Sequence, residues 1–142
     1  ALTYAGEGDP DIIISMATLT GAARVAVGSD LTPFYAGSDI HARMLISAGK
    51  TALDPLWQMP FWDPYEALIE PTIADLDNAP KGGFAGSITA ALFLRRFVPD
   101  PNRFIHFDIY GWNPTKVPGR PQGGTLQGAR AGLRALEDIF SL

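Results

Sequence analysis

The segment IIISMATLTGAARVAVG, residues 12–28, decides the fold because it joins an apolar run to a polar, glycine-containing turn. The isoleucine-rich run over residues 11–19 is typical of a strand buried on both faces of a parallel or mixed sheet. The stretch ARVAVG, which follows the turn, alternates with period two and predicts a second short strand. The segment therefore indicates a sheet protein whose first strand ends in the sequence TLTG.

The polar turn has two interpretations. Ligands of α/β folds bind at the carboxyl ends of strands, where Gly21 would let the backbone approach a ligand and Thr18 and Thr20 would offer hydroxyl groups. Taken alone, the residues favour the simpler interpretation, in which both threonines satisfy backbone groups where the strand ends.

Further strands and helices alternate along the chain. Strands are predicted at TPFYAG, residues 32–37, and at RFIHFDIYGW, residues 103–112. Apolar spacing predicts helices from Ser38 to about Leu53, from GGFAGS to Pro99, and at the C-terminus. The segment 54–83, rich in proline and aromatic residues, reads as loop with a short helix near Tyr65 to Ile69. This alternation predicts an α/β fold, a three-layer mixed sheet flanked by helices.

The composition limits the class of protein. The 142 residues are 46% hydrophobic and 18% charged, which excludes a disordered tail, and no segment has the roughly 18 uncharged apolar residues of a membrane helix. With 11 basic and 15 acidic residues the net charge is −4, which disfavours a nucleic-acid surface. The chain has no cysteine, so it forms no disulfide and no thiolate zinc site, as expected in a reducing cytoplasm. We expect no nucleic-acid partner, no membrane partner and a cytoplasmic location.

Ser87, His106 and Asp108 raise the hypothesis of a serine hydrolase. His106 and Asp108 share one face of the predicted strand at about 6 to 7 Å, a poor arrangement for an aspartate that must orient the histidine ring. No G-x-S-x-G elbow surrounds Ser87. The same histidine and aspartate lack a third ligand for a metal site, so a satisfied, partly buried pair is favoured.

Other polar motifs favour structural roles. KGGFAGS, residues 81–87, offers backbone N–H groups to an anion at a helix start, but its glycines fit close packing better and it is no P-loop. Asp75, Asp77 and Asn78 have the spacing of a calcium loop without its glycine and closing glutamate, which favours a turn. His41 is predicted to be a surface residue of its helix.

Several motifs occur together in one order along the chain. They are ATLTGA (17–22), ADLDNAP (74–80) leading into GGFAGSITAALFLRRFV (82–98), HFDIYGW (106–112) and GRPQGGTLQGARAGLRAL (119–136). In this order they resemble the C-terminal part of the catalytic domain in the leucyl (cytosol) aminopeptidase family. The resemblance runs from Ala1 to about Leu136, and the agreement of separated motifs makes it specific.

The resemblance implies part of a two-metal exopeptidase that removes N-terminal residues such as leucine from peptide substrates. Members of the family hold two divalent ions, commonly zinc or manganese, through a lysine and carboxylates, several of them in an NTDAEGR motif whose arginine holds a bicarbonate. The metal pair lowers the pKa of a shared water and clamps the scissile carbonyl. The family usually forms hexamers, which implies a homo-oligomer.

The resemblance also assigns substrate-side residues. Main-chain groups of one loop, beside the metals, would contact the substrate and the bicarbonate. This TLTG loop consists of Thr18, Leu19, Thr20 and Gly21. Tyr110 and Asn113 fall where the family lines the pocket for the first side chain of the substrate. Many members carry a small residue at the position of Tyr110, so a phenol here would fill part of the pocket, and Ser15 stands where an aspartate is usual.

The sequence departs from the family because it lacks NTDAEGR. By the resemblance it thereby lacks every metal ligand and both catalytic basic residues, which are the arginine that holds the bicarbonate and a second lysine that assists proton transfer. We therefore expect residues 1–142 to be an incomplete catalytic domain that forms the wall of the site, partnered by a missing N-terminal part. No metal ion, bicarbonate or catalytic residue is expected in this chain alone, which would be inactive. A non-catalytic binding or assembly module on the same scaffold is the alternative. Exposed sheet edges would make the chain associate.

Overall fold

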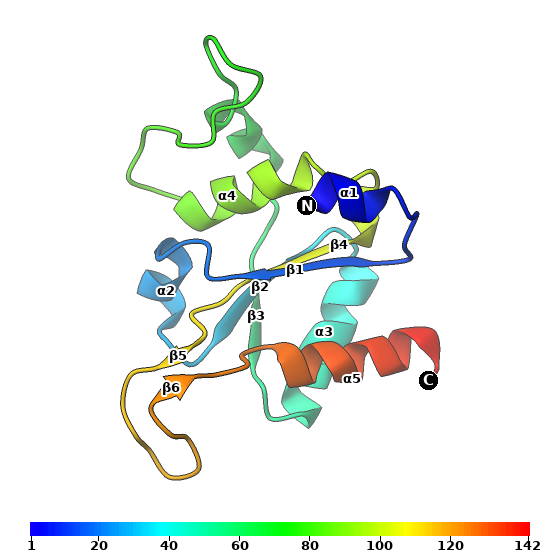
Figure 1. Ribbon diagram of the computed structural model, residues 1–142, viewed down its shortest axis with the longest axis vertical. Coiled ribbons are helices and arrows are strands. Elements are labelled where there is room, and N and C mark those ends of the chain that lie inside the picture. The colour runs from blue at the N-terminus through cyan, green and yellow to red at the C-terminus, as the bar shows by residue number, and fades with distance from the viewer.

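A mixed sheet of four strands forms the centre of the computed structural model, which describes residues 1–142 (Figure 1). The strands are β1 (Ile13–Ala17), β2 (Thr32–Ala36), β3 (Leu56–Gln58) and β4 (Phe104–Asp108), and a separate small hairpin pairs β5 (Trp112–Asn113) with β6 (Gly123–Gly124). The helices are α1 (Leu2–Gly6), α2 (Ala22–Val27), α3 (Asp39–Thr51), α4 (Gly86–Arg95) and α5 (Ala129–Phe140), with 3₁₀ turns η1 (Asp63–Leu68) and η2 (Pro101–Arg103).

The strand order is β1-β4-β2-β3, which places β4 inside the sheet. β4 runs parallel to β1 and antiparallel to β2, and β2 runs parallel to β3. Every residue of β4 is buried, as a strand covered on both faces requires. In the register, His106 lies between Ser15 of β1 and Tyr35 of β2.

Helices cover both faces of this sheet (Figure 1). α3 and α5 pack against each other on one face, and α1 and α4 lie on the other. The larger core cluster, on the α3 and α5 side, consists of Phe34, Ala42, Leu45, Ala48, Ile105, Phe107 and Ala135. A smaller cluster consists of Ile13, Val98 and Phe104. The three-layer mixed α/β architecture predicted from the sequence is confirmed.

The strand predicted at ARVAVG is wrong, because these residues form helix α2. Six residues are too few to separate a period of two from a helical period, and alanine favours the helix. Within α2 only Ala23 is buried, and Val25 is 90% exposed. Val25 is apolar and yet exposed, so the apolar residues of this stretch do not mark a buried face.

The long proline-rich segment holds one strand that the sequence did not predict. β3 covers three residues within it and pairs with β2 at the edge of the sheet. The short helix expected near Tyr65 is the 3₁₀ turn η1, which is joined to the end of α4 by ion pairs of Arg95 and Arg96 with Glu66. None of the helices is both long and apolar enough to cross a lipid bilayer.

Candidate functional site

The TLTG loop is fixed to the sheet by the carboxylate of Asp108, the last residue of β4. Its Oδ1 accepts hydrogen bonds from the backbone N–H groups of Leu19 (3.1 Å) and Thr20 (2.9 Å). Its Oδ2 accepts a hydrogen bond from the Thr20 hydroxyl at 2.5 Å. The contact follows from topology, since Ala17 pairs with Asp108 in the parallel register and the loop leaves the sheet beside it. The Thr20 hydroxyl therefore has a structural role, but its partner is a side-chain carboxylate and not the backbone group that the simpler interpretation of this turn expected.

Asp108 is held in turn from the opposite side, by α4. The Ser87 hydroxyl donates to Asp108 Oδ2 at 2.8 Å, and its oxygen lies 2.6 Å from the Tyr35 hydroxyl. Because Ser87 gives its proton to the carboxylate, Tyr35 is the donor to Ser87. Burial raises the pKa of Tyr35, so the phenol remains protonated and able to donate. Hydrogen bonds are thus donated from both sides toward the carboxylate of Asp108, by Tyr35 through Ser87 and by Thr20 of the loop.

The loop keeps its carbonyl groups free. No donor within the chain bonds the carbonyl oxygens of Thr18, Leu19 or Thr20, whereas the N–H groups of Leu19 and Thr20 are taken by Asp108. Thr18 and Leu19 are exposed. The surface of the loop therefore presents hydrogen-bond acceptors, of the kind that pair with the N–H groups of an extended peptide.

The geometry disagrees with the serine-hydrolase hypothesis. Ser87 bonds Asp108, and the Nδ1 atom of His106 instead lies 3.3 Å from the hydroxyl oxygen of Ser15. His106 is fully buried, stacks on Tyr35 and Phe104, and leaves Nε2 without a partner. Burial lowers the pKa of His106 against the opposing effect of the Asp108 charge, which favours a neutral ring. The carboxylate of Asp108 is satisfied, as the sequence indicated, but the histidine is only half satisfied, and both residues are buried where the sequence indicated partial burial.

Tyr110 contacts the start of the TLTG loop directly, and Arg24 links it to the end of the loop. The Thr18 hydroxyl donates a long hydrogen bond of 3.4 Å to the Tyr110 carbonyl oxygen. From the first turn of α2, the guanidinium of Arg24 lies 4.2 Å from the centre of the Tyr110 ring. A Cβ atom added to Gly21 would come within 3.3 Å of the same guanidinium. The structure thus brings five of the six predicted residues, those of the TLTG loop and Tyr110, into one neighbourhood with Arg24.

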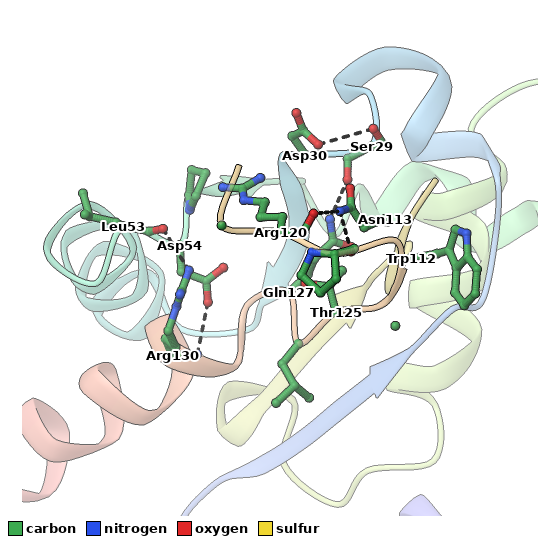
Figure 2. Close-up of a pocket in the computed structure, with 15 residues that line it drawn as sticks. Ser29, Asp30, Leu53, Asp54, Trp112, Asn113, Arg120, Thr125, Gln127 and Arg130 are labelled. Atoms are coloured by element: carbon green, nitrogen blue, oxygen red, sulfur yellow. Dashed lines mark hydrogen bonds between the residues drawn. The ribbon is translucent and has the colours of Figure 1, made fainter. Parts of the chain in front are cut away.

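Asn113 has a different position, on the wall of a cavity of about 330 Å³ that Figure 2 shows. Its side-chain amide donates to the carbonyl oxygens of Arg120 (3.1 Å) and Pro121 (2.8 Å), which holds the following loop in place. Trp112, Arg120 and Arg130 also line this cavity. The amide of Asn113 is therefore engaged within the chain, and the hydrogen bonds do not join it to the TLTG loop.

Two residues of structural importance went unnoticed in the sequence. Gln127 accepts from the N–H of Gly111 (2.7 Å) and donates to the carbonyl oxygen of Ser29 (2.5 Å), which ties the strand end to the segment after α2. Asp54 accepts hydrogen bonds from backbone N–H groups at the start of α5 and so caps that helix. Both act through contacts more than 15 residues apart in sequence, and no local pattern could have indicated them.

The remaining polar motifs have structural roles, with one correction. Asp77 accepts from the N–H of Ala79 at 2.9 Å, the turn contact that the sequence favoured. Gly86 packs close to Ala22 of α2, where a Cβ would come within 3.4 Å of the alanine side chain. His41 is half-buried and its Nδ1 is enclosed without a partner, so it is less exposed than the surface residue that the sequence predicted.

The donor set of this chain does not fit a metal centre. Nowhere do three or more histidine, aspartate or glutamate side chains gather so that they could hold a metal ion. Near the TLTG loop the buried carboxylate is Asp108, whose oxygens already accept from the loop and from Ser87.

Known proteins resemble the chain over most of its length. A model of the cytosol aminopeptidase family, catalytic domain, matches residues 1–132. The probable cytosol aminopeptidase of Syntrophotalea carbinolica is 45% identical over 139 residues, which cover 96% of this chain and 28% of that protein. The cytosol aminopeptidase of Encephalitozoon cuniculi is 40% identical over 111 residues, covering 78% and 23%.

Solved structures have the same fold. The crystal structure of the cytosol aminopeptidase of Coxiella burnetii aligns with a TM-score of 0.90 at 45% identity, over 96% of this chain and 30% of that one. A mutant of tomato leucine aminopeptidase aligns with a TM-score of 0.85 at 31% identity, over 96% and 26%. The chain thus spans less than a third of the length of these relatives. Since the family model covers far more than half of the chain, these 142 residues belong to the cytosol aminopeptidase family and match its catalytic domain.

Proposed function

We propose that this chain forms the substrate-side wall of an aminopeptidase that removes N-terminal residues from peptides. The observation that carries the proposal is the arrangement of the TLTG loop. Asp108 binds the N–H groups of the loop, and the carbonyl oxygens of the loop stay unpaired beside exposed side chains. A fixed row of acceptors holds a peptide backbone without reorganising when the substrate binds. Membership of the family supports the reaction class.

The chemistry of the reaction would come from residues outside this chain. Two divalent ions, zinc or manganese, and a bicarbonate would be held by segments of the kind that make up the remainder of the longer relatives. The residues of this chain would bind and orient the peptide, with Tyr110 bounding the pocket for its first side chain. We also propose a homo-oligomer, as in a family hexamer, and a cytoplasmic location, which the names of the relatives support.

The test compares the 142-residue chain with the complete product of its gene. Each is assayed with leucine 4-nitroanilide in the presence of Zn²⁺ or Mn²⁺, and its bound metal is measured after removal of free ions. We expect turnover and bound metal only where the family's ligand residues are present. Stoichiometric binding of two metal ions by the 142-residue chain with normal turnover would contradict the assignment of the metal site to other segments.

A non-catalytic binding or assembly module remains the second candidate, motivated by the absence of a metal-ligand cluster in these residues. The two candidates differ in what the gene encodes before Ala1. An NTDAEGR motif in frame there supports the peptidase. Its absence, together with no turnover by the complete product, supports the module.

A further inference from the structure

One arginine beside the TLTG loop has no acidic partner. Arg95, Arg96, Arg103 and Arg134 form ion pairs with carboxylates, whereas Arg24 forms none. Arg24 is exposed, and its side chain enters no hydrogen bond within the chain. The N–H donors of this guanidinium are therefore free to bind a group that the chain itself does not supply.

The guanidinium of Arg24 nevertheless has a defined position. Its central carbon lies over the ring of Tyr110, 4.2 Å from the ring centre, and one of its nitrogens lies close to Gly21. Tyr110 is itself held, since its carbonyl oxygen accepts from Thr18 and the N–H of the next residue, Gly111, donates to Gln127. Attraction to an aromatic face restrains a guanidinium group, and the N–H groups of Arg24 are available for hydrogen bonds because none of them bonds within the chain.

We propose that Arg24, supported by Tyr110, selects peptides whose N-terminal residue is aspartate or glutamate. The inference rests on the proposed function, in which Tyr110 bounds the pocket for the first side chain. The edge of a guanidinium presents parallel N–H donors that match both oxygens of a carboxylate. In the pocket that the proposed function places beside Tyr110, the phenol ring would leave less room for a branched apolar side chain, and the unpaired positive charge of Arg24 would repel an N-terminal lysine or arginine.

The test isolates the charge of the first side chain. The complete gene product is assayed with the 4-nitroanilides of α-linked glutamate, glutamine and leucine, which carry no second carboxylate that could bind Arg24 instead. Glutamate and glutamine have nearly the same shape, so their ratio of kcat/KM measures the charge. We expect kcat/KM for the glutamate anilide to exceed that for the glutamine anilide by about 10-fold or more. A tenfold ratio corresponds to about 1.4 kcal/mol.

Substitutions assign this ratio to the arginine. Arg24→Gln is expected to bring the ratio of kcat/KM for glutamate to that for glutamine to about 1. Arg134→Gln is the matched control, since it removes the same charge from an arginine of α5 that pairs with Glu137 and Asp138, and it should keep the wild-type ratio. Circular dichroism checks that both variants are folded.

The outcomes separate the two proposals. If the wild type hydrolyses all three anilides with equal preference for glutamate and glutamine, or if Arg24→Gln keeps the preference, the role of Arg24 is wrong and the peptidase stands. If the complete product hydrolyses none of a wider set of aminoacyl anilides, the proposed function itself fails.

Discussion

At the scale of single residues, Asp108 joins parts of the chain that lie far apart in sequence. It bonds Thr20, 88 residues away, and Ser87, 21 residues away, and is only 3% exposed. A buried carboxylate is tolerated when hydrogen-bond donors surround it, and here four donor groups do so. The shape of the TLTG loop is thus set by a residue on another strand.

Substitution of Thr20 tests this contact. Thr20→Val keeps the shape of the side chain but removes the hydroxyl that donates to Asp108. Because the bond involves a charged acceptor, we expect the free energy of unfolding to fall by about 1.5–3 kcal/mol, measured by urea denaturation. Thr20→Ser keeps the donor and serves as the control. Equal stability of the valine and serine variants would show that the hydroxyl contributes nothing.

His106 makes stability depend on pH. Burial lowers its pKa in the folded chain below the ordinary value of 6.5, so the unfolded chain binds a proton at a higher pH than the folded one. As the pH falls below about 6.5, the unfolded state gains protons first and stability decreases, by at most about 1.4 kcal/mol per pH unit for one group. Above that pH both states are neutral at this residue and its contribution is constant.

The measurement is the free energy of unfolding at several pH values between 5 and 8 for the wild type and for His106→Gln. The glutamine variant does not titrate, so its curve should be flatter between pH 5 and 6.5, whatever the absolute cost of the substitution in the core. Parallel curves for the two proteins would mean that His106 is protonated in the folded state as readily as in the unfolded chain.

At the scale of elements, the sequence predicted best where a pattern is long. β1, β2, β4, α3, α4 and α5 were all expected near their observed positions, because buried strands and amphipathic helices repeat their signal over many residues. The six residues of α2 and the three of β3 carry too little pattern, and both were missed. The same limit applies to the candidate site. The TLTG loop could be recognised from a short stretch of sequence, but its link to Asp108 and the contact of Arg24 with Tyr110 depend on how β1 and β4 pair.

The start of α5 gives a prediction at this scale. Gly128 precedes the helix and has no side chain to cap it, and Asp54 accepts instead from the N–H groups of Gly128, Arg130 and Ala131. We expect Asp54→Ala to lower the free energy of unfolding by about 1–2 kcal/mol, since a helix cap and a buried charge are lost together. Asp54→Asn keeps an acceptor and should cost less. Urea denaturation compares the variants, and equal losses for alanine and asparagine would argue against the cap.

At the scale of the whole molecule, the sheet ends in strands with free edges. β1 pairs only with β4 and β3 only with β2, so each has one row of unpaired backbone groups. β1 is the longer edge, and Met16 on it is 42% exposed. An exposed apolar edge strand is a site for pairing with another chain.

We therefore expect the 142-residue chain to associate in solution through β1. Light scattering coupled to size-exclusion chromatography should give a mass above the 15.2 kDa of one chain, rising with protein concentration. Met16→Lys places a charge on the edge, which natural sheets use against pairing, and should shift the mass toward the monomer. Ile73→Lys is the matched control, because Ile73 is 98% exposed in a loop away from the sheet, and it should leave association unchanged. A wild-type monomer at all concentrations, or equal effects of the two lysines, would exclude the β1 edge as the surface of association.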